Sequence, residues 1–291
     1  MSNSAPIIDL KTYPCPLCGN EKSTQLYVVD EFSIVRCVDC SMVYVNPRLI
    51  NEKVYTLYTD NYFHRALHGY ENYELTAHLR IKTFKRWYKT IVPYCLREKG
   101  HALDIGCAAG YFLDVLKKDG WLAEGIELDK EIYASLVQRG YDVYDQPLEK
   151  FIAPHRYELI TLFDVVEHLP HVQSDFAKLH TMLADGGILA LVTPNFDSLQ
   201  RKIFGKRWFQ FKPMEHIYYF SLQTLKKIAD QHDFAVLEKK STGQYADIDF
   251  IMDRLRKYGF LPLKTMPRSN IVSGLSWYAD TGSMLVILQK K

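Results

Sequence analysis

The sequence lacks a charge imbalance, and it lacks long apolar runs. Its 291 residues carry 36 Lys and Arg against 34 Asp and Glu, a formal net charge of +2. Such a balance provides no basic surface for nucleic acid or an anionic membrane, so we expect neither as a partner. No apolar run approaches the roughly 18 residues of a membrane span. The first residues also lack the basic and apolar segments of a signal peptide, so we expect a cytoplasmic protein.

Cysteines are also few, but four of the six lie near the amino terminus. Cys15, Cys18, Cys37 and Cys40 form two C-x2-C pairs, a spacing typical of a tetrahedral Zn²⁺ site. Between the pairs, residues 23–37 alternate as two short strands would, so the segment resembles a zinc ribbon. Disulfides and rubredoxin-like iron are the alternatives, although a cytoplasmic chain disfavours disulfides. We expect structural zinc, because four thiolates leave no open coordination position.

From His101 onwards the sequence alternates between strand and helix patterns. The apolar periodicity predicts strands at 101–106, 121–128, 141–145, 157–166, 188–195, 235–241 and 282–290, and helices at 110–120, 129–140, 172–187 and 221–234. This alternation predicts an α/β fold with a seven-stranded, mostly parallel sheet and helices on both faces. Residues 76–96 also have helical periodicity, and residues 249–260 read as a helical insertion.

Three regions follow from these patterns. We predict a zinc-ribbon-like head at 1–48 and a helical cap at 49–98. The main α/β domain is predicted at 99–291, with insertions near 196–220 and 244–280.

The ends of the first two predicted strands carry the features of a binding site. In such sheets, ligands bind at the carboxyl ends of the strands. The first strand ends at Asp104 and a small-residue loop with Gly106, Ala108 and Gly110, and the second ends at Glu127, 23 residues after Asp104. An acid at that place can accept hydrogen bonds from ribose hydroxyls. Because the loop reads D-x-G-x-x-x-G rather than G-x-G-x-x-G, we expect a nucleoside ligand without a pyrophosphate.

The stretches "LDIGCAAGYFLDVL", "GIELD", "FDVVEHL" and "LADGGILALVTPN" resemble the class I S-adenosylmethionine-dependent methyltransferases over roughly residues 99–291. The cysteine pairs followed by "YVNPR" resemble a bacterial subset that carries a zinc-binding head. The resemblance implies a Rossmann-like sheet with an antiparallel seventh strand, and S-adenosylmethionine as cofactor. Ala108 departs from the glycine that is commoner at its position. The cofactor-binding residues that the resemblance implies are Asp104, Gly106, Cys107, Ala108, Gly110, Glu127, Leu128, Asp145, Leu148 and Phe163.

Two histidines are candidates for the general base that a hydroxyl acceptor needs. His216 follows the fifth strand at the end of an insertion that we expect to cover the substrate, and it is our first choice. His168 follows the fourth strand and is the second choice; a structural role stays open for each. Asp164, Glu167 and His168 also resemble an acid-x-x-Glu-His pattern with a metal-binding role in quinone O-methyltransferases. The same "EHL" is common in relatives with unrelated substrates.

These features predict an S-adenosylmethionine-dependent methyltransferase that acts on a small molecule. Transfer to oxygen of a sugar, nucleotide sugar or secondary metabolite fits the zinc-headed subset. Two alternatives stay open: a tRNA- or protein-modifying methyltransferase that grips its polymer with the head, and a protein that binds S-adenosylmethionine without transferring methyl. The near-neutral charge argues against the polymer. The sequence leaves open the acceptor atom and the oligomeric state.

Overall fold

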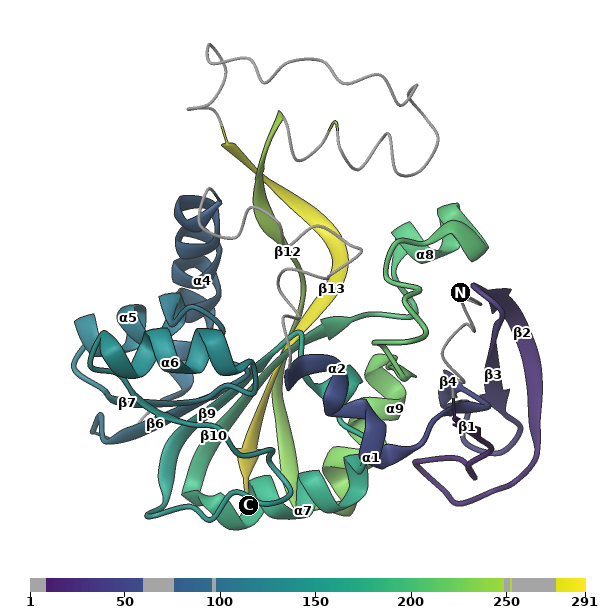
Figure 1. The fold of residues 1–291 in the computed structure, drawn as a ribbon, viewed down its shortest axis with the longest axis horizontal. Coiled ribbons are helices and arrows are strands. Elements are labelled where there is room, and N and C mark those ends of the chain that lie inside the picture. The colour runs from purple at the N-terminus through teal and green to yellow at the C-terminus, as the bar shows by residue number, and fades with distance from the viewer. Residues whose placement is uncertain (1–8, 60–75, 96–97, 249–251, 253–275) are drawn as a thin grey trace, which may run out of the picture.

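The chain forms an α/β fold around one seven-stranded sheet (Figure 1). The computed structural model describes residues 9–59, 76–95, 98–248, 252 and 276–291. The strands of the main sheet are β6 (His101–Ile105), β7 (Leu122–Ile126), β8 (Asp142–Tyr144), β9 (Tyr157–Phe163), β10 (Leu183–Pro194), β12 (Phe234–Asp247) and β13 (Ser276–Lys290). Their order is β12-β13-β10-β9-β6-β7-β8, and within this sheet β13 alone runs opposite in direction to the other six strands. The predicted fold class, including the antiparallel seventh strand, is confirmed.

The last two strands are longer than the sequence predicted. β12 continues six residues past the expected end at residue 241, and β13 begins six residues before residue 282, because the two strands keep pairing as an antiparallel ribbon. Gly243 lies at a register shift of this ribbon, where a Cβ would lie 1.8 Å from Ala279 O. Only glycine permits this close approach. The helix predicted at 249–260 lies outside the described residues, apart from Met252.

Helices cover both faces of the sheet (Figure 1). One face carries α4 (Ala77–Ile91), α5 (Tyr111–Lys118) and α6 (Lys130–Gln138), and the other carries α7 (Val172–Met182) and α9 (Leu222–Gln231). Side-chain caps fix two of the starts: Asp129 accepts two backbone N–H groups at the start of α6, and Ser221 forms a capping box with Thr224 in α9. The predicted periodicity at 76–96 corresponds to α4. In the described ranges, none of the helices is long and apolar enough to cross a membrane.

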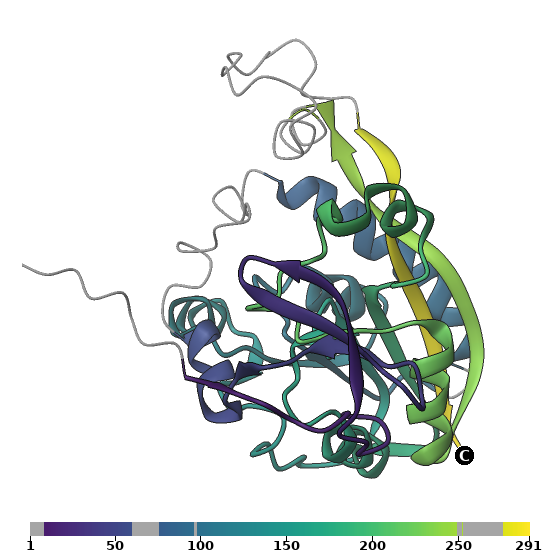
Figure 2. The same cartoon turned by 90° about the vertical axis from the view of Figure 1, so that its right-hand side faces the viewer.

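The amino-terminal segment builds a second sheet, to which a distant part of the chain contributes (Figure 2). Its strands are β2 (Ser23–Val29), β3 (Phe32–Cys37), β4 (Val43–Val45) and β11 (Tyr218–Tyr219), while β1 (Leu10–Lys11) pairs with β5 (Arg48–Leu49). β11 belongs to the insertion predicted near 196–220. In that insertion, α8 (Leu199–Phe204) is followed by Trp208 and Phe211, which pack in one apolar cluster with Phe32. The insertion therefore shares a core with the head, and the domain boundaries stay a prediction.

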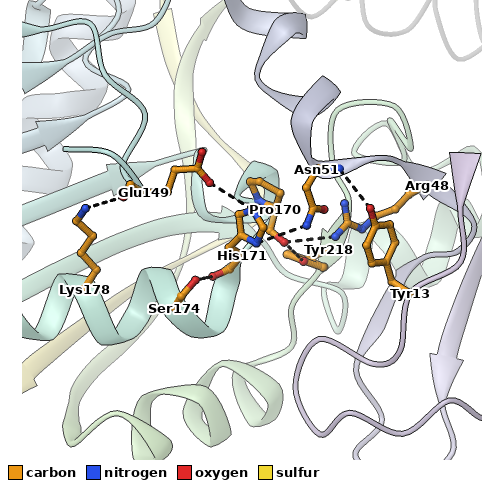
Figure 3. Close-up of polar contacts among 9 residues, drawn as sticks. All are labelled: Tyr13, Arg48, Asn51, Glu149, Pro170, His171, Ser174, Lys178 and Tyr218. Carbon is orange, nitrogen blue, oxygen red and sulfur yellow. Dashed lines mark hydrogen bonds and ion pairs between the residues drawn. The ribbon is translucent and has the colours of Figure 1, made fainter. Parts of the chain in front are cut away.

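Arg48 connects the head to the segment that follows β9 (Figure 3). Its side chain is 3% exposed, and its guanidinium donates to Leu49 O at 3.2 Å and to Pro170 O at 3.3 Å. The guanidinium also packs over the Tyr13 ring at 4.1 Å. Tyr218 OH donates to the same Pro170 oxygen at 3.1 Å. A buried cation is costly without such partners, so these contacts fix how the head sits on the main sheet.

We predict that Arg48→Ala lowers the free energy of unfolding by about 2–3 kcal/mol, because it removes charge-assisted hydrogen bonds and the packing of the apolar stem. Equilibrium denaturation with urea measures the change. Arg207→Ala is the control, because Arg207 is exposed in the insertion, and its effect should stay within about 0.5 kcal/mol. Equal losses in the two variants would contradict the role of Arg48.

Candidate functional site

A cavity lies at the carboxyl ends of β6, β7 and β9. Its volume is about 210 Å³, compared with about 10–15 Å³ for a single water molecule. In sheets of this kind, this edge is where ligands bind. Eight of the ten cofactor residues predicted from the sequence line the cavity: Asp104, Gly106, Cys107, Ala108, Glu127, Leu128, Leu148 and Phe163.

The loop after β6 presents its backbone to the cavity. Gly106 has φ 74°, and a Cβ there would lie 2.6 Å from Val165 Cγ2. Ala108 also lies in the left-handed region, with φ 46°, where glycine is commoner. Gly110 does not line the cavity. It is the left-handed N-cap of α5, where a Cβ would lie 2.9 Å from Leu136 Cδ2, so this glycine serves the turn into the helix.

Glu127 ties the loop after β6 to the loop after β7. Its Oε2 accepts the Ala108 N–H at 2.8 Å, and its Oε1 accepts the Asp129 N–H at 2.8 Å. Each carboxylate oxygen can accept a further hydrogen bond, so the residue can still bind a ligand. Burial raises the pKa of Glu127 to about 7, although the backbone N–H groups oppose the rise.

Asp104 is a second buried carboxyl group at the cavity. It accepts a hydrogen bond from Thr161 Oγ1 at 2.6 Å. Burial raises the pKa of Asp104 to about 7, the Thr161 hydrogen bond opposes this rise, and the charge of Glu127 adds to it. Asp104 and Glu127 are therefore carboxyl groups of the cavity whose charge changes near neutral pH.

One wall of the cavity is aromatic and comes largely from α4. Phe84 and Trp87 both pack on Phe163. The ring centroid of Phe163 lies 6.0 Å from that of Phe84 and 5.1 Å from that of Trp87. Trp87 Nε1 donates to Gly243 O at 3.1 Å and so fixes α4 against β12. The sequence predicted one apolar side for this helix, and the fold shows that part of that side faces the cavity.

Sequence reasoning missed several polar residues of the cavity. Tyr55, Tyr58 and Arg80 come from the region predicted as a helical cap, and Gln244 and Tyr245 come from the unexpected extension of β12. The density of tyrosines in the cap was the available signal. Conversely, Asp145 is exposed and does not line the cavity, so a cofactor role has no geometric support there.

The two candidate bases differ in position. His168 lines the cavity, whereas His216 is 4% exposed, donates from Nδ1 to Gln210 O at 2.8 Å, and does not line the cavity. His168 Nδ1 lies 2.8 Å from Tyr58 Oη and from Glu215 O. Because a carbonyl only accepts, Nδ1 carries the proton and Nε2 has the lone pair. Burial lowers the pKa of His168 to about 4, so its ring is neutral at pH 7. The geometry favours His168 over our first choice, His216.

The two acids before His168 lie in different surroundings. Asp164 lines the cavity as an exposed residue, yet desolvation of its carboxyl group by the surrounding protein raises its pKa to about 6. Glu167 is fully buried, accepts from Thr193 Oγ1 at 2.9 Å, and has a pKa raised well above its usual value by burial. Glu167, His168 and His216 each place one ligand atom within 4.8 Å of the others. The sequence pattern pointed to Asp164, Glu167 and His168 as possible metal ligands. The structure instead brings together Glu167, His168 and His216.

The four amino-terminal cysteines also converge. The sulfur atoms of Cys15 and Cys40 lie 3.4 Å apart, those of Cys18 and Cys37 lie 3.5 Å apart, and all four lie within 4.8 Å of one another. A disulfide would need about 2.05 Å, so the thiols are free. Around a tetrahedral Zn²⁺ with Zn–S bonds of about 2.3 Å, the sulfur atoms would lie about 3.8 Å apart. The cluster therefore fits the donor set of a zinc site.

Comparisons with known proteins agree with this fold. A family model described as a methyltransferase domain matches residues 76–239. The ubiquinone biosynthesis O-methyltransferase of Coxiella burnetii is 26% identical over 102 residues, which cover 33% of this chain and 44% of that protein. The chain thus matches less than half the length of these curated relatives.

Two solved structures share the fold. A methyltransferase from Thermotoga maritima, described as a possible histamine N-methyltransferase, has a TM-score of 0.50 and 17% identity, with 79% of this chain and 98% of that chain covered. An S-adenosylmethionine-dependent methyltransferase from Archaeoglobus fulgidus has a TM-score of 0.50 and 16% identity, with 75% and 99% covered. The family match spans more than half of the chain and coincides with the sheet and its cavity. The chain belongs to the methyltransferase domain family, and it shares the fold of the two solved methyltransferases.

Proposed function

We propose that this enzyme methylates a hydroxyl oxygen of a small, flat and largely apolar molecule. The observation that carries the proposal is a single cavity that joins Glu127 and the backbone at 106–108 to an aromatic wall and the neutral His168. Aromatic walls suit flat apolar acceptors, on which they can stack. The Coxiella relatives are named as O-methyltransferases of ubiquinone biosynthesis, which supports oxygen as the acceptor atom.

The residues at the strand ends fit S-adenosylmethionine. Glu127 retains lone pairs for ribose hydroxyls, and the open backbone at Gly106 and Ala108 allows the amino-acid tail to approach. Leu128 and Leu148 supply apolar surface beside Glu127 for the adenine. We therefore assign these residues to the cofactor.

The chain's own residues contribute to methyl transfer chiefly by aligning the acceptor and by keeping water out of the cavity. S-adenosylmethionine supplies an electrophilic methyl group on a sulfonium. The cavity would hold the acceptor next to the cofactor, and Phe84 and Trp87 would exclude water from it. His168 Nε2 accepts the proton from the acceptor hydroxyl as that oxygen becomes acidic during bond formation.

We also propose that Cys15, Cys18, Cys37 and Cys40 bind one structural Zn²⁺. The convergence of four sulfur atoms from two turns of the head supports this role. Four thiolates would close the coordination sphere, so the ion would stabilise the head and take no part in methyl transfer.

Replacement of Glu127 tests the cofactor site. Glu127→Gln should weaken S-adenosylhomocysteine binding about 10- to 100-fold, because it removes a charged acceptor and directs an amide NH₂ at a backbone N–H. Asp145→Asn is the matched control and should change the affinity less than about twofold, because Asp145 does not line the cavity. Isothermal titration calorimetry measures both, and equal affinities in the two variants would refute the ribose role.

The same residue predicts a pH dependence. The pKa of Glu127 is raised to about 7, so the ligand-binding carboxylate predominates only above pH 7. The wild-type affinity should therefore fall as pH decreases from 8 to 6, by up to about tenfold for each carboxyl group that must ionise. The slope should be smaller in Glu127→Gln, where Asp104 and Asp164 remain to titrate.

A panel of acceptors tests the reaction and its base. Release of S-adenosylhomocysteine should occur with catechols or other hydroxylated aromatic molecules, rather than with sugars, tRNA or protein. With the active acceptor, His168→Asn should lower kcat about 10²- to 10⁴-fold and leave cofactor affinity unchanged. His216→Asn should have a much smaller effect, because His216 does not line the cavity. The reverse ranking would return the role of base to His216.

Metal analysis tests the head. Cys15→Ser should lose one equivalent of zinc and unfold the head, while the cofactor affinity stays close to that of the wild type. Cys95→Ser is the control, because Cys95 lies outside the four-sulfur cluster. Metal-free wild-type protein with an intact head, measured after purification without chelators, would exclude the zinc role.

A further inference from the structure

A separate cluster of metal-ligand side chains lies toward the amino-terminal ends of the main strands, away from the cavity. His101 begins β6, Glu124 lies within β7, and His155 precedes β9. Glu124 Oε1 lies 3.2 Å from His101 Nδ1 and 2.8 Å from His155 Nε2. One ligand atom from each residue lies within 4.8 Å of the others, and none of the three lines the cavity.

The other oxygen of Glu124 is held in place. Its Oε2 accepts hydrogen bonds from Tyr144 OH at 3.0 Å and from Tyr157 OH at 2.9 Å. Such outer hydrogen bonds orient the carboxylate ligands of metal sites. Here they direct Oε1 at the two imidazoles. The Glu124 side chain is 9% exposed, whereas those of His101 and His155 are 34% and 31% exposed, so an ion can enter from solvent.

Hydrogen bonding explains only part of this arrangement, because His101 Nδ1 and Glu124 Oε1 form a hydrogen bond at 3.2 Å while His155 Nε2 has no such partner among the described residues. His155 Nε2 is buried and close to Glu124 Oε1, yet within the described part of the chain it makes no hydrogen bond of acceptable geometry. The His101 and His155 rings also lie against each other, with centroids 3.6 Å apart. Each ring thus presents one nitrogen to the same carboxylate oxygen, an arrangement that one shared cation would satisfy.

The separations between the donor atoms fit one first-row divalent ion. Metal–ligand bonds of about 2.0–2.1 Å place neighbouring donors about 2.8–3.4 Å apart in octahedral or tetrahedral geometry, and the two separations at Glu124 are 3.2 and 2.8 Å. We propose that His101, Glu124 and His155 bind a divalent ion of the Zn²⁺ class, with water completing its coordination. Two imidazoles and one carboxylate suit Zn²⁺, Co²⁺ or Ni²⁺ better than Mg²⁺ or Ca²⁺.

Such an ion joins three parts of the chain that are distant in sequence. It links the starts of β6 and β9 to β7, and it anchors the segment 145–156 at its carboxyl end. The same segment contributes Pro147 and Leu148 to the cavity. The site is thus a structural clamp outside the place of methyl transfer, and it does not depend on which acceptor the enzyme uses.

Zinc content after dialysis against low-micromolar free Zn²⁺, measured by mass spectrometry, tests the proposal. The wild type should retain one equivalent more zinc than His155→Ala, which loses a ligand. His171→Ala is the matched control: it removes another partly exposed histidine, whose Nε2 lies 3.3 Å from Glu149 Oε2, and it should retain the wild-type content. The comparison between variants holds whether or not the four cysteines bind zinc.

Further variants distinguish zinc bound at this site from zinc bound by the four cysteines. Glu124→Gln should lose the same equivalent as His155→Ala, while Cys15→Ser should keep it. Co²⁺ at this site should absorb weakly in the visible range without a thiolate charge-transfer band, because its ligands are nitrogen and oxygen. Equal zinc content in the wild type and in folded His155→Ala, verified by circular dichroism, overturns the proposal. An equal loss in His171→Ala also overturns it.

Discussion

The cofactor site depends on the two hydrogen bonds that Glu127 accepts from the backbone N–H groups of Ala108 and Asp129. They join the loop after β6 to the start of α6, two segments that follow neighbouring strands. Ile126 O supports the same junction by accepting the Gly106 N–H at 2.8 Å. A buried carboxylate needs such donors, and the left-handed turn of the loop needs a fixed partner. The Glu127 carboxylate and the loop after β6 therefore stabilise each other, and the cavity lies beside them.

Local patterns account for what the sequence could predict. A strand, a small-residue loop and a helix are adjacent in sequence, so the places of Asp104, Gly106 and Ala108 follow from short-range signals. Glu127 follows in the same way, since parallel neighbouring strands end at one edge of the sheet. The four cysteines are predictable because each pair needs only one tight turn. These parts of the fold and of the candidate site can be predicted with little knowledge of long-range packing.

Contacts between distant segments account for what the sequence could not predict. His216 and His168 both follow strands at the correct edge, yet Tyr218 pairs with Tyr44 of the head, and His216 packs against the His168 ring without lining the cavity itself. Gln244 reaches the cavity only because β12 continues its pairing with β13. The apolar periodicity of the segment with His216 or of β12 does not predict pairing with a distant strand. The choice between the two histidines therefore had to come from the fold.

The same long-range packing sets the electrostatics of the site. Phe84 and Trp87 of α4 cover the cavity that Asp104 and Glu127 line, and burial is the largest cause of the rise in both carboxyl pKa values to about 7. A desolvated carboxyl group gains more from a cationic or hydrogen-bonding ligand than one that water already solvates. The aromatic wall that we propose excludes water from the transferred methyl group therefore also limits the solvation of these acids, apart from the donors that each already has. A helix that the sequence identified only as a cap thus lines the cavity and contributes to its desolvation.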